Sequence, residues 1–102
     1  MEVDTEVRFS DNKKENELRT EIINIIKNTQ YDIIEFFIDD KSFGNIVLVI
    51  DDGRNQVRFI QDRGDIYVER RAKDQQIWNE LSSPQIPYDI GFLQAIKLFV
   101  KQ

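Results

Sequence analysis

The residue types in this sequence that could do chemistry are carboxylates, lysine, tyrosine, serine and threonine. Two short clusters of carboxylates stand out: Asp39-Asp40, and Asp62-Arg63-Gly64-Asp65. Aspartate is common in tight turns because its side chain bonds the turn backbone, so a purely structural role accounts for both clusters. A divalent-cation site is a second interpretation, although the Asp-x-Asp-x-Asp-Gly spacing of a calcium loop is missing from the sequence. The third interpretation is an anionic surface that docks a basic partner.

The residue types that are missing exclude much catalytic chemistry. The chain has no cysteine and no histidine, which excludes disulfides, the usual zinc sites, cysteine nucleophiles and imidazole acid–base catalysis. Its four glycines are dispersed, so there is no glycine-rich phosphate loop. A carboxylate pair for hydrolysis would need a cleft that removes at least one acid from water. We therefore predict a protein that is not an enzyme, with no catalytic residue, no metal and no cofactor.

Charge is unevenly distributed along the chain. Its 102 residues carry 19 acidic and 14 basic side chains, a net charge of −5. Residues 1–52 hold thirteen acids and six bases, a net of −7, whereas residues 53–102 hold six acids and eight bases, a net of +2. This balance suits a basic protein partner and not a nucleic acid, because phosphate contacts need clustered cations. The acidic start lacks the parts of a secretory signal, and no apolar run could span a bilayer, so we expect a cytoplasmic protein without membrane contact.

Hydrophobic periodicity predicts the elements that position the acidic clusters. Residues 3–9 alternate between apolar and polar types, which indicates either a half-buried strand or a frayed terminus. Residues 13–28 carry one apolar stripe, so we predict a helix there, with Asn12 and Glu15 in a capping-box pattern. The stripe consists of Leu18, Ile22, Ile25, Ile26 and Thr29.

Strand-like runs follow at residues 31–39, 45–51, 55–61 and 66–71. In the first run we expect Ile34, Phe36 and Ile38 to share one face, because side chains alternate along a strand. The second run is apolar throughout, which is typical of a central strand covered on both faces. Breaks at residues 52–53 and 63–64 favour tight hairpins, so consecutive strands should be antiparallel and form a meander.

The remaining residues are predicted to form a connecting segment and a helix that pack over this sheet. Residues 72–83 could form a short helix or an irregular lid. Trp78 is either an interface residue or a core plug beneath that lid, and we favour the core plug, while Tyr88 is left open between core and interface. Asp89 can cap a final helix with the apolar face Phe92, Leu93, Ile96, Phe99 and Val100. The predicted fold is a single α+β domain over residues 1–102, in which an N-terminal and a C-terminal helix cover one face of a four-stranded antiparallel meander. An added fifth, N-terminal strand is left open.

Alternate loops of a meander lie at the same end of its sheet. The loop after the first strand and the loop after the third should therefore meet, and we predict one partner-binding surface there, made of Asp39, Asp40, Asp62, Arg63 and Asp65. The aspartates would pair with lysine and arginine of the partner, and Arg63 would be either an internal counter-ion or a specific contact. The opposite end should hold a basic excess, in which interleaved acids favour cross-strand salt bridges over nucleic-acid contact. Its basic residues are Arg54, Arg58, Arg70, Arg71 and Lys73.

The run from Phe43 to Arg71, FGNIVLVIDDGRNQVRFIQDRGDIYVERR, resembles small bacterial proteins that are often encoded beside polymorphic toxin genes as immunity proteins. The matching features are Gly44-Asn45, Val57-Arg58-Phe59, Asp62-Arg63-Gly64, and Trp78 seven residues after the last predicted strand. These features belong to turns and core, cover roughly a third of the chain, and transfer no functional residue. The resemblance implies an inhibitor that binds a cognate secreted toxin in the cytoplasm.

The function favoured by these observations is protein binding without catalysis, and most concretely inhibition of a basic toxin or nuclease by an acidic surface. The alternative is a structural or self-associating domain of a bacterial or phage protein, for instance a homodimer. A small hydrolase that uses carboxylates is a third hypothesis, and a desolvated acid pair in a pocket would distinguish it.

Overall fold

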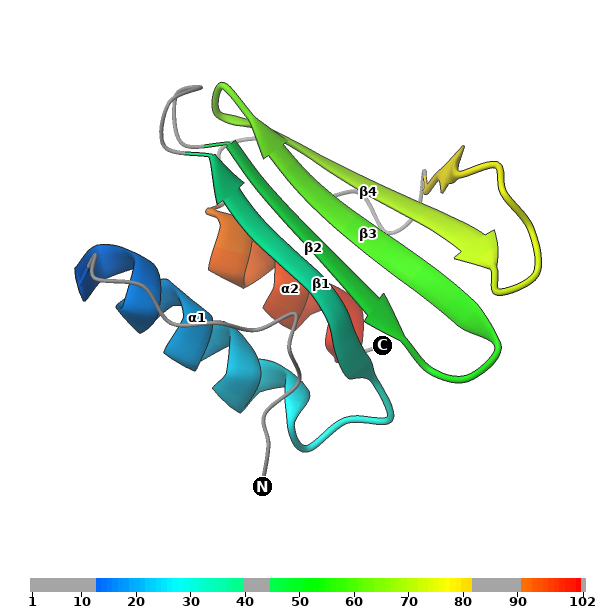
Figure 1. The fold of residues 1–102 in the computed structure, drawn as a ribbon, viewed down its shortest axis with the longest axis horizontal. Coiled ribbons are helices and arrows are strands. Elements are labelled where there is room, and N and C mark those ends of the chain that lie inside the picture. The colour runs from blue at the N-terminus through cyan, green and yellow to red at the C-terminus, as the bar shows by residue number, and fades with distance from the viewer. Residues whose placement is uncertain (1–12, 40–44, 82–90, 102) are drawn as a thin grey trace.

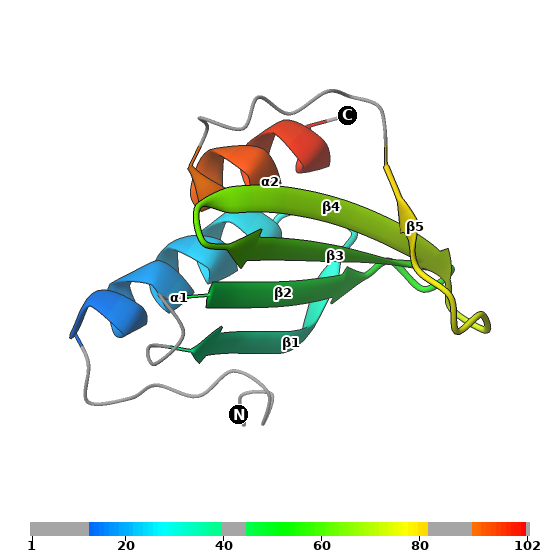
Figure 2. The same cartoon turned by 90° about the horizontal axis from the view of Figure 1, so that it is seen from above.

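The computed structural model describes residues 13–39, 45–81 and 91–101 of the chain. The five strands form one antiparallel sheet in which each strand lies beside its neighbour in sequence (Figure 2). The predicted α+β class and meander are therefore confirmed. The fifth strand lies at the β4 edge, whereas the strand predicted at residues 3–9 falls outside the described residues. In chain order (Figure 1), the elements are α1 (Lys13–Ile26), β1 (Asp32–Asp39), β2 (Asn45–Asp51), β3 (Asn55–Asp62), β4 (Asp65–Ala72), β5 (Asn79–Glu80) and α2 (Phe92–Val100).

Helix α1 forms where the apolar stripe predicts it and ends two residues earlier than expected. Its stripe packs on the sheet, with Ile22 and Ile26 buried. Thr29 does not extend the stripe. Its Oγ1 donates a hydrogen bond to the Ile26 carbonyl oxygen at 2.7 Å and accepts one from the Tyr31 N–H at 3.1 Å. Thr29 thus closes the helix and directs the chain into β1.

One face of the sheet carries the core, and both helices pack against that face (Figures 1 and 2). Phe59 lies at its centre, with ring centroids 6.4 Å from Phe92 and 5.6 Å from Phe99 in edge-to-face arrangements. Helix α2 begins at Phe92 behind an N-cap at Gly91, so the predicted cap at Asp89, itself outside the described residues, is two positions too early. The strands β2 to β4 supply alternate residues to the core: Ile46, Leu48, Ile50, Val57, Phe59 and Val68.

Strand β1 departs from the predicted alternation at one point. The register shifts between Ile33 and Glu35, which marks a β-bulge. Because an extra residue in one strand reverses the alternation beyond it, Ile33 joins Phe36 and Ile38 against the core. The expectation that Ile34 shares their face is therefore wrong.

The sheet face opposite the helices is called the outer face below. Trp78 lies on this face, so its predicted place in the core is wrong. The Arg58 and Arg71 guanidinium groups each lie 4.3 Å from the centroid of its ring. A tryptophan ring can be covered by cationic side chains as well as by apolar ones, which is how Trp78 becomes half-buried outside the core. The described part of segment 72–83 forms a turn and then β5, with no helix, and Tyr88 falls outside the described residues.

Candidate functional site on the outer face of the sheet

The strand order brings the end of β1 and the β3–β4 turn to the same end of the sheet, as predicted. Asp39 is paired with Asn45 across β1 and β2, and Asp62 is paired with Asp65 across β3 and β4. Alternation along the strands places these four residues on the outer face. We call Asp39, Asp62 and Asp65 the acidic row, which spans three strand spacings, about 14 Å. Asp40 falls outside the described residues, and its part in the surface stays a prediction.

The β3–β4 turn that joins Asp62 to Asp65 has left-handed backbone at both central residues. Arg63 has φ 55° and Gly64 has φ 92°, which is the pattern of a type I′ hairpin. The Arg63 N–H donates a hydrogen bond to Asn45 Oδ1 at 3.2 Å, which ties the turn to β2. Glycine at residue 64 agrees with the predicted turn. Arginine at residue 63 is unusual there, because a Cβ is disfavoured at positive φ.

Replacing Arg63 by asparagine is expected to stabilise the protein by about 0.5 to 1 kcal/mol, because Asn-Gly is the preferred pair for a type I′ turn. Thermal unfolding should then show a rise in Tm of roughly 2 to 5 °C. Arg63→Ala is the matched control, since it removes the same side chain without gaining a left-handed preference. Equal stability of the two variants would contradict this account of the turn.

Beside the acidic row lies a line of apolar side chains that the sequence analysis missed. Phe37 is paired with Val47, Val47 with Ile60, and Ile60 with Tyr67, so the four residues cross four strands in register. We call them the apolar row. Phe37 is 52% exposed and Tyr67 41%, and Val47 and Ile60 are half-buried between them. Only the register reveals this row, because its members come from four separate strands.

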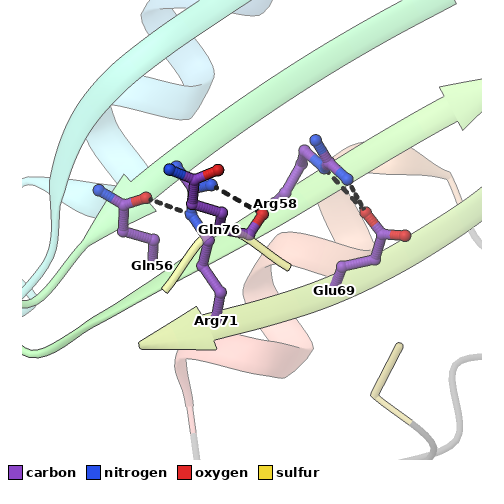
Figure 3. Close-up of polar contacts among 5 residues, drawn as sticks. All are labelled: Gln56, Arg58, Glu69, Arg71 and Gln76. Carbon is purple, nitrogen blue, oxygen red and sulfur yellow. Dashed lines mark hydrogen bonds and ion pairs between the residues drawn. The ribbon is translucent and has the colours of Figure 1, made fainter. Parts of the chain in front are cut away.

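A polar network occupies the outer face near the opposite end of the sheet (Figure 3). Arg58 donates to Glu69 Oε1 from Nε at 2.8 Å and from Nη2, which confirms the expected cross-strand salt bridge for this arginine. Arg71 Nε donates to Gln56 Oε1 at 2.9 Å, and Gln56 Nε2 donates to the buried Asp51 Oδ2 at 3.1 Å. Together with Trp78 these contacts cover the β3 and β4 side of that half of the face, whereas Glu35 on β1 and Glu80 on β5 are exposed there.

The β2–β3 turn is held by a carboxylate. Asp52 Oδ1 accepts hydrogen bonds from the Arg54 N–H at 2.9 Å and the Asn55 N–H at 2.8 Å. The bonds from Asn55 and then Arg54 hold the pKa of Asp52 below its ordinary value. Gly53 supplies the positive φ of 98° that the turn needs. This acidic residue therefore has a structural role, as the sequence analysis allows for turn aspartates.

Replacing Asp52 by asparagine is expected to cost about 1 kcal/mol of unfolding free energy at pH 7, because a charged acceptor is exchanged for a neutral one. The folded-state pKa lies below the unfolded one, so the stabilisation is complete above the unfolded pKa, about 4, and is lost as the pH falls through the folded pKa. Urea denaturation of both proteins at pH 7 and pH 3 should show a smaller difference in unfolding free energy at pH 3. A constant difference would contradict the assigned cause.

A shallow depression of about 600 Å³ lies beside the end of α1 and the start of β1. Among the described residues, its lining is mainly apolar and contains one carboxylate, Asp32, so these residues provide no acid pair of the kind that hydrolysis requires. Within the described residues, no group of three or more acidic side chains is placed to hold a metal ion. The depression is lined by Ile23, Ile26, Lys27, Thr29, Tyr31, Asp32, Ile33 and Ile34.

Arg19 on α1 is a cationic side chain that lies partly buried between its helix and the sheet, which the apolar periodicity of the sequence does not indicate. Its guanidinium carbon lies 4.7 Å from the centroid of the Phe36 ring, and its Nη2 lies 4.0 Å from Glu15 Oε1. Burial lowers the pKa of Arg19, and the charge of Glu15 partly offsets this. Phe36 belongs to the core side of β1, so Arg19 takes part in helix packing and not in the outer face.

Comparison of the chain with protein-family models, with curated proteins and with solved structures finds no match. Across the described ranges, neither helix is both long and apolar enough to cross a membrane.

Proposed function

We propose that this chain is a non-catalytic protein-binding domain that inhibits a basic bacterial toxin or nuclease in the cytoplasm, using its acidic row. The observation that carries the proposal is the direct pairing of Asp62 with Asp65, both exposed, in a row with Asp39. Like charges directly opposite each other on a sheet are destabilising. A partner that brings lysine or arginine to this row relieves that repulsion and is steered to it over long range.

The backbone of Arg63 supports the same surface. A residue held in a sparsely populated conformation is a reason to look for function there, and Arg63 has positive φ where asparagine or glycine would fit better. Asp62 and Asp65 flank it on the same turn. We assign Arg63 a specific contact with an acidic or polar group of the partner. On this assignment, Asp62 and Asp65 on either side of Arg63 each bind a lysine or arginine of the partner.

Self-association is the second candidate function, and the exposure of Phe37 and Tyr67 favours it. Large apolar side chains exposed together on one face commonly mark an interface between proteins. A second copy of the chain could cover them, as in a structural domain of a bacterial or phage protein. Acidic side chains lie on both sides of the apolar row and favour the basic partner, because two copies of this chain would bring like charges together.

The test uses the gene that lies directly beside this one in its genome. Its product, expressed alone in a bacterial host, should stop growth, and co-expression of this chain should restore growth and yield a complex that co-purifies in equal amounts. A harmless neighbour, or toxicity that this chain does not relieve, would overturn the proposal. A chain carrying Glu17→Lys and Glu21→Lys on α1 serves as a control that changes charge away from the outer face.

A further inference from the structure

The apolar row lies between two lines of acidic side chains. The acidic row is two residues along each strand in one direction, about 7 Å away. In the other direction Glu35 is paired with Val49, Val49 with Arg58, Arg58 with Glu69, and Glu69 with Glu80. That second line holds three acids and one base, and the base already bonds Glu69. The outer face therefore presents an apolar centre with net negative charge on both flanks.

The charges on the flanks decide against a second copy of this chain as the occupant. If two copies met face to face with their rows aligned, acidic row would meet acidic row. If one copy were instead rotated by 180° in the plane of its sheet, the acidic row of each copy would meet the line of Glu35, Glu69 and Glu80 of the other. Arg58 offsets one of the three charges in that line. Both arrangements bring like charges together, which costs free energy at an interface.

The dimensions of the apolar row suit a helix laid across the strands. Adjacent strands are about 4.8 Å apart, so the row is about 14 Å long. The apolar stripe of an amphipathic helix repeats about every 5.4 Å, close to the strand spacing, and a length of 14 Å corresponds to about ten residues. Successive turns of such a helix would place one apolar side chain over each strand, and lysine or arginine beside the stripe would reach both acidic flanks.

We propose that the row of Phe37, Val47, Ile60 and Tyr67, with acids on both sides, receives an amphipathic helix of the partner whose apolar stripe is flanked on both sides by lysine or arginine. This inference rests on the proposed function and specifies the partner's contact. The acids steer the helix and set its orientation, and the exposed aromatic side chains anchor it, as aromatic residues do at interface centres.

The direct test is a titration with a 14-residue helical peptide that has leucines at i, i+3, i+4 and i+7 and lysines beside them. Backbone amide chemical shifts should change, saturably, at the apolar row and on both acidic flanks. The variant F37T/Y67T should bind at least tenfold more weakly; threonine is chosen because it is well tolerated in strands. Leu98→Gln is the matched control, since Leu98 on α2 is 39% exposed and lies away from the outer face.

Three outcomes would overturn the inference. The first is equal binding of a scrambled peptide of the same composition, which would reduce the contact to charge alone. The second is unchanged peptide affinity in F37T/Y67T, whose fold is checked by circular dichroism. The third is a dimer in sedimentation experiments that F37T/Y67T abolishes, which would assign the face to a second copy.

The same variants separate this inference from the proposed function. If the neighbouring toxin is neutralised equally by wild type and by F37T/Y67T, the proposed function stands and the helix contact is wrong. If no toxin is neutralised but the peptide binds as described, the helix contact stands and the proposed function is wrong.

Discussion

Replacing Phe59 by alanine is expected to lower the free energy of unfolding by about 3 to 5 kcal/mol, which is a large part of the 5 to 15 kcal/mol typical of a small domain. Phe59 is fully buried, and its ring contacts the rings of Phe92 and Phe99, which lie near the two ends of α2. Its loss removes buried apolar area, leaves a cavity and ends both edge-to-face contacts. Urea denaturation followed by circular dichroism measures the effect.

Phe37→Ala provides the control for this prediction. Phe37 is also a phenylalanine in the middle of a strand, but its side chain is 52% exposed on the outer face. We expect a loss of less than about 1 kcal/mol, because little apolar area leaves the protein interior. Similar losses in both variants would mean that the two faces of the sheet are assigned wrongly.

Reversing the charge of the acidic row, with Asp39→Lys, Asp62→Lys and Asp65→Lys together, is expected to slow association with the basic toxin roughly ten- to a hundredfold. The association rate of the variant should also depend less on salt, because the attraction that salt screens has been removed. Stopped-flow or surface-plasmon measurements from low to physiological ionic strength would record both effects. The dissociation rate should change less.

A second triple variant shows whether position or only net charge matters. Glu17→Lys, Glu21→Lys and Asp74→Lys change the net charge by the same amount at exposed residues away from the acidic row. We expect a smaller loss of association rate in this variant. Equal losses would assign the steering to overall charge, and unchanged rates in the acidic-row variant would remove that row from the binding surface.

The elements that periodicity predicted well are those whose signal is local. The stripe on α1, the alternation in β3 and β4, and the Asp52-Gly53 and Arg63-Gly64 breaks each lie within a few residues, and each appears in the structure. The bulge near Ile33 was not predictable in this way, because it depends on how β1 meets β2. Trp78 was misplaced because its ring is covered by Arg58 and Arg71, which approach it only after the segment following β4 folds back.

The same distinction between local and long-range signals applies to the candidate site. The position of Asp39, Asp62 and Asp65 at one end of the sheet followed from the short breaks between strands, because short connections force neighbouring strands to be antiparallel. The apolar row did not follow, because a shift of one residue in any pairing would move Phe37 or Tyr67 out of line.

The amino-acid sequence alone determined the α+β class, the sequential strands, the turns and the excess of acid at one end, because each depends on neighbouring residues and on steric rules of the backbone. Only the tertiary structure decided which side chains stand beside one another across strands and which face the helices leave accessible. Those relations arise from hydrogen-bond register and packing between distant segments. The local sequence permits several registers equally well, and small differences in packing free energy determine which one forms.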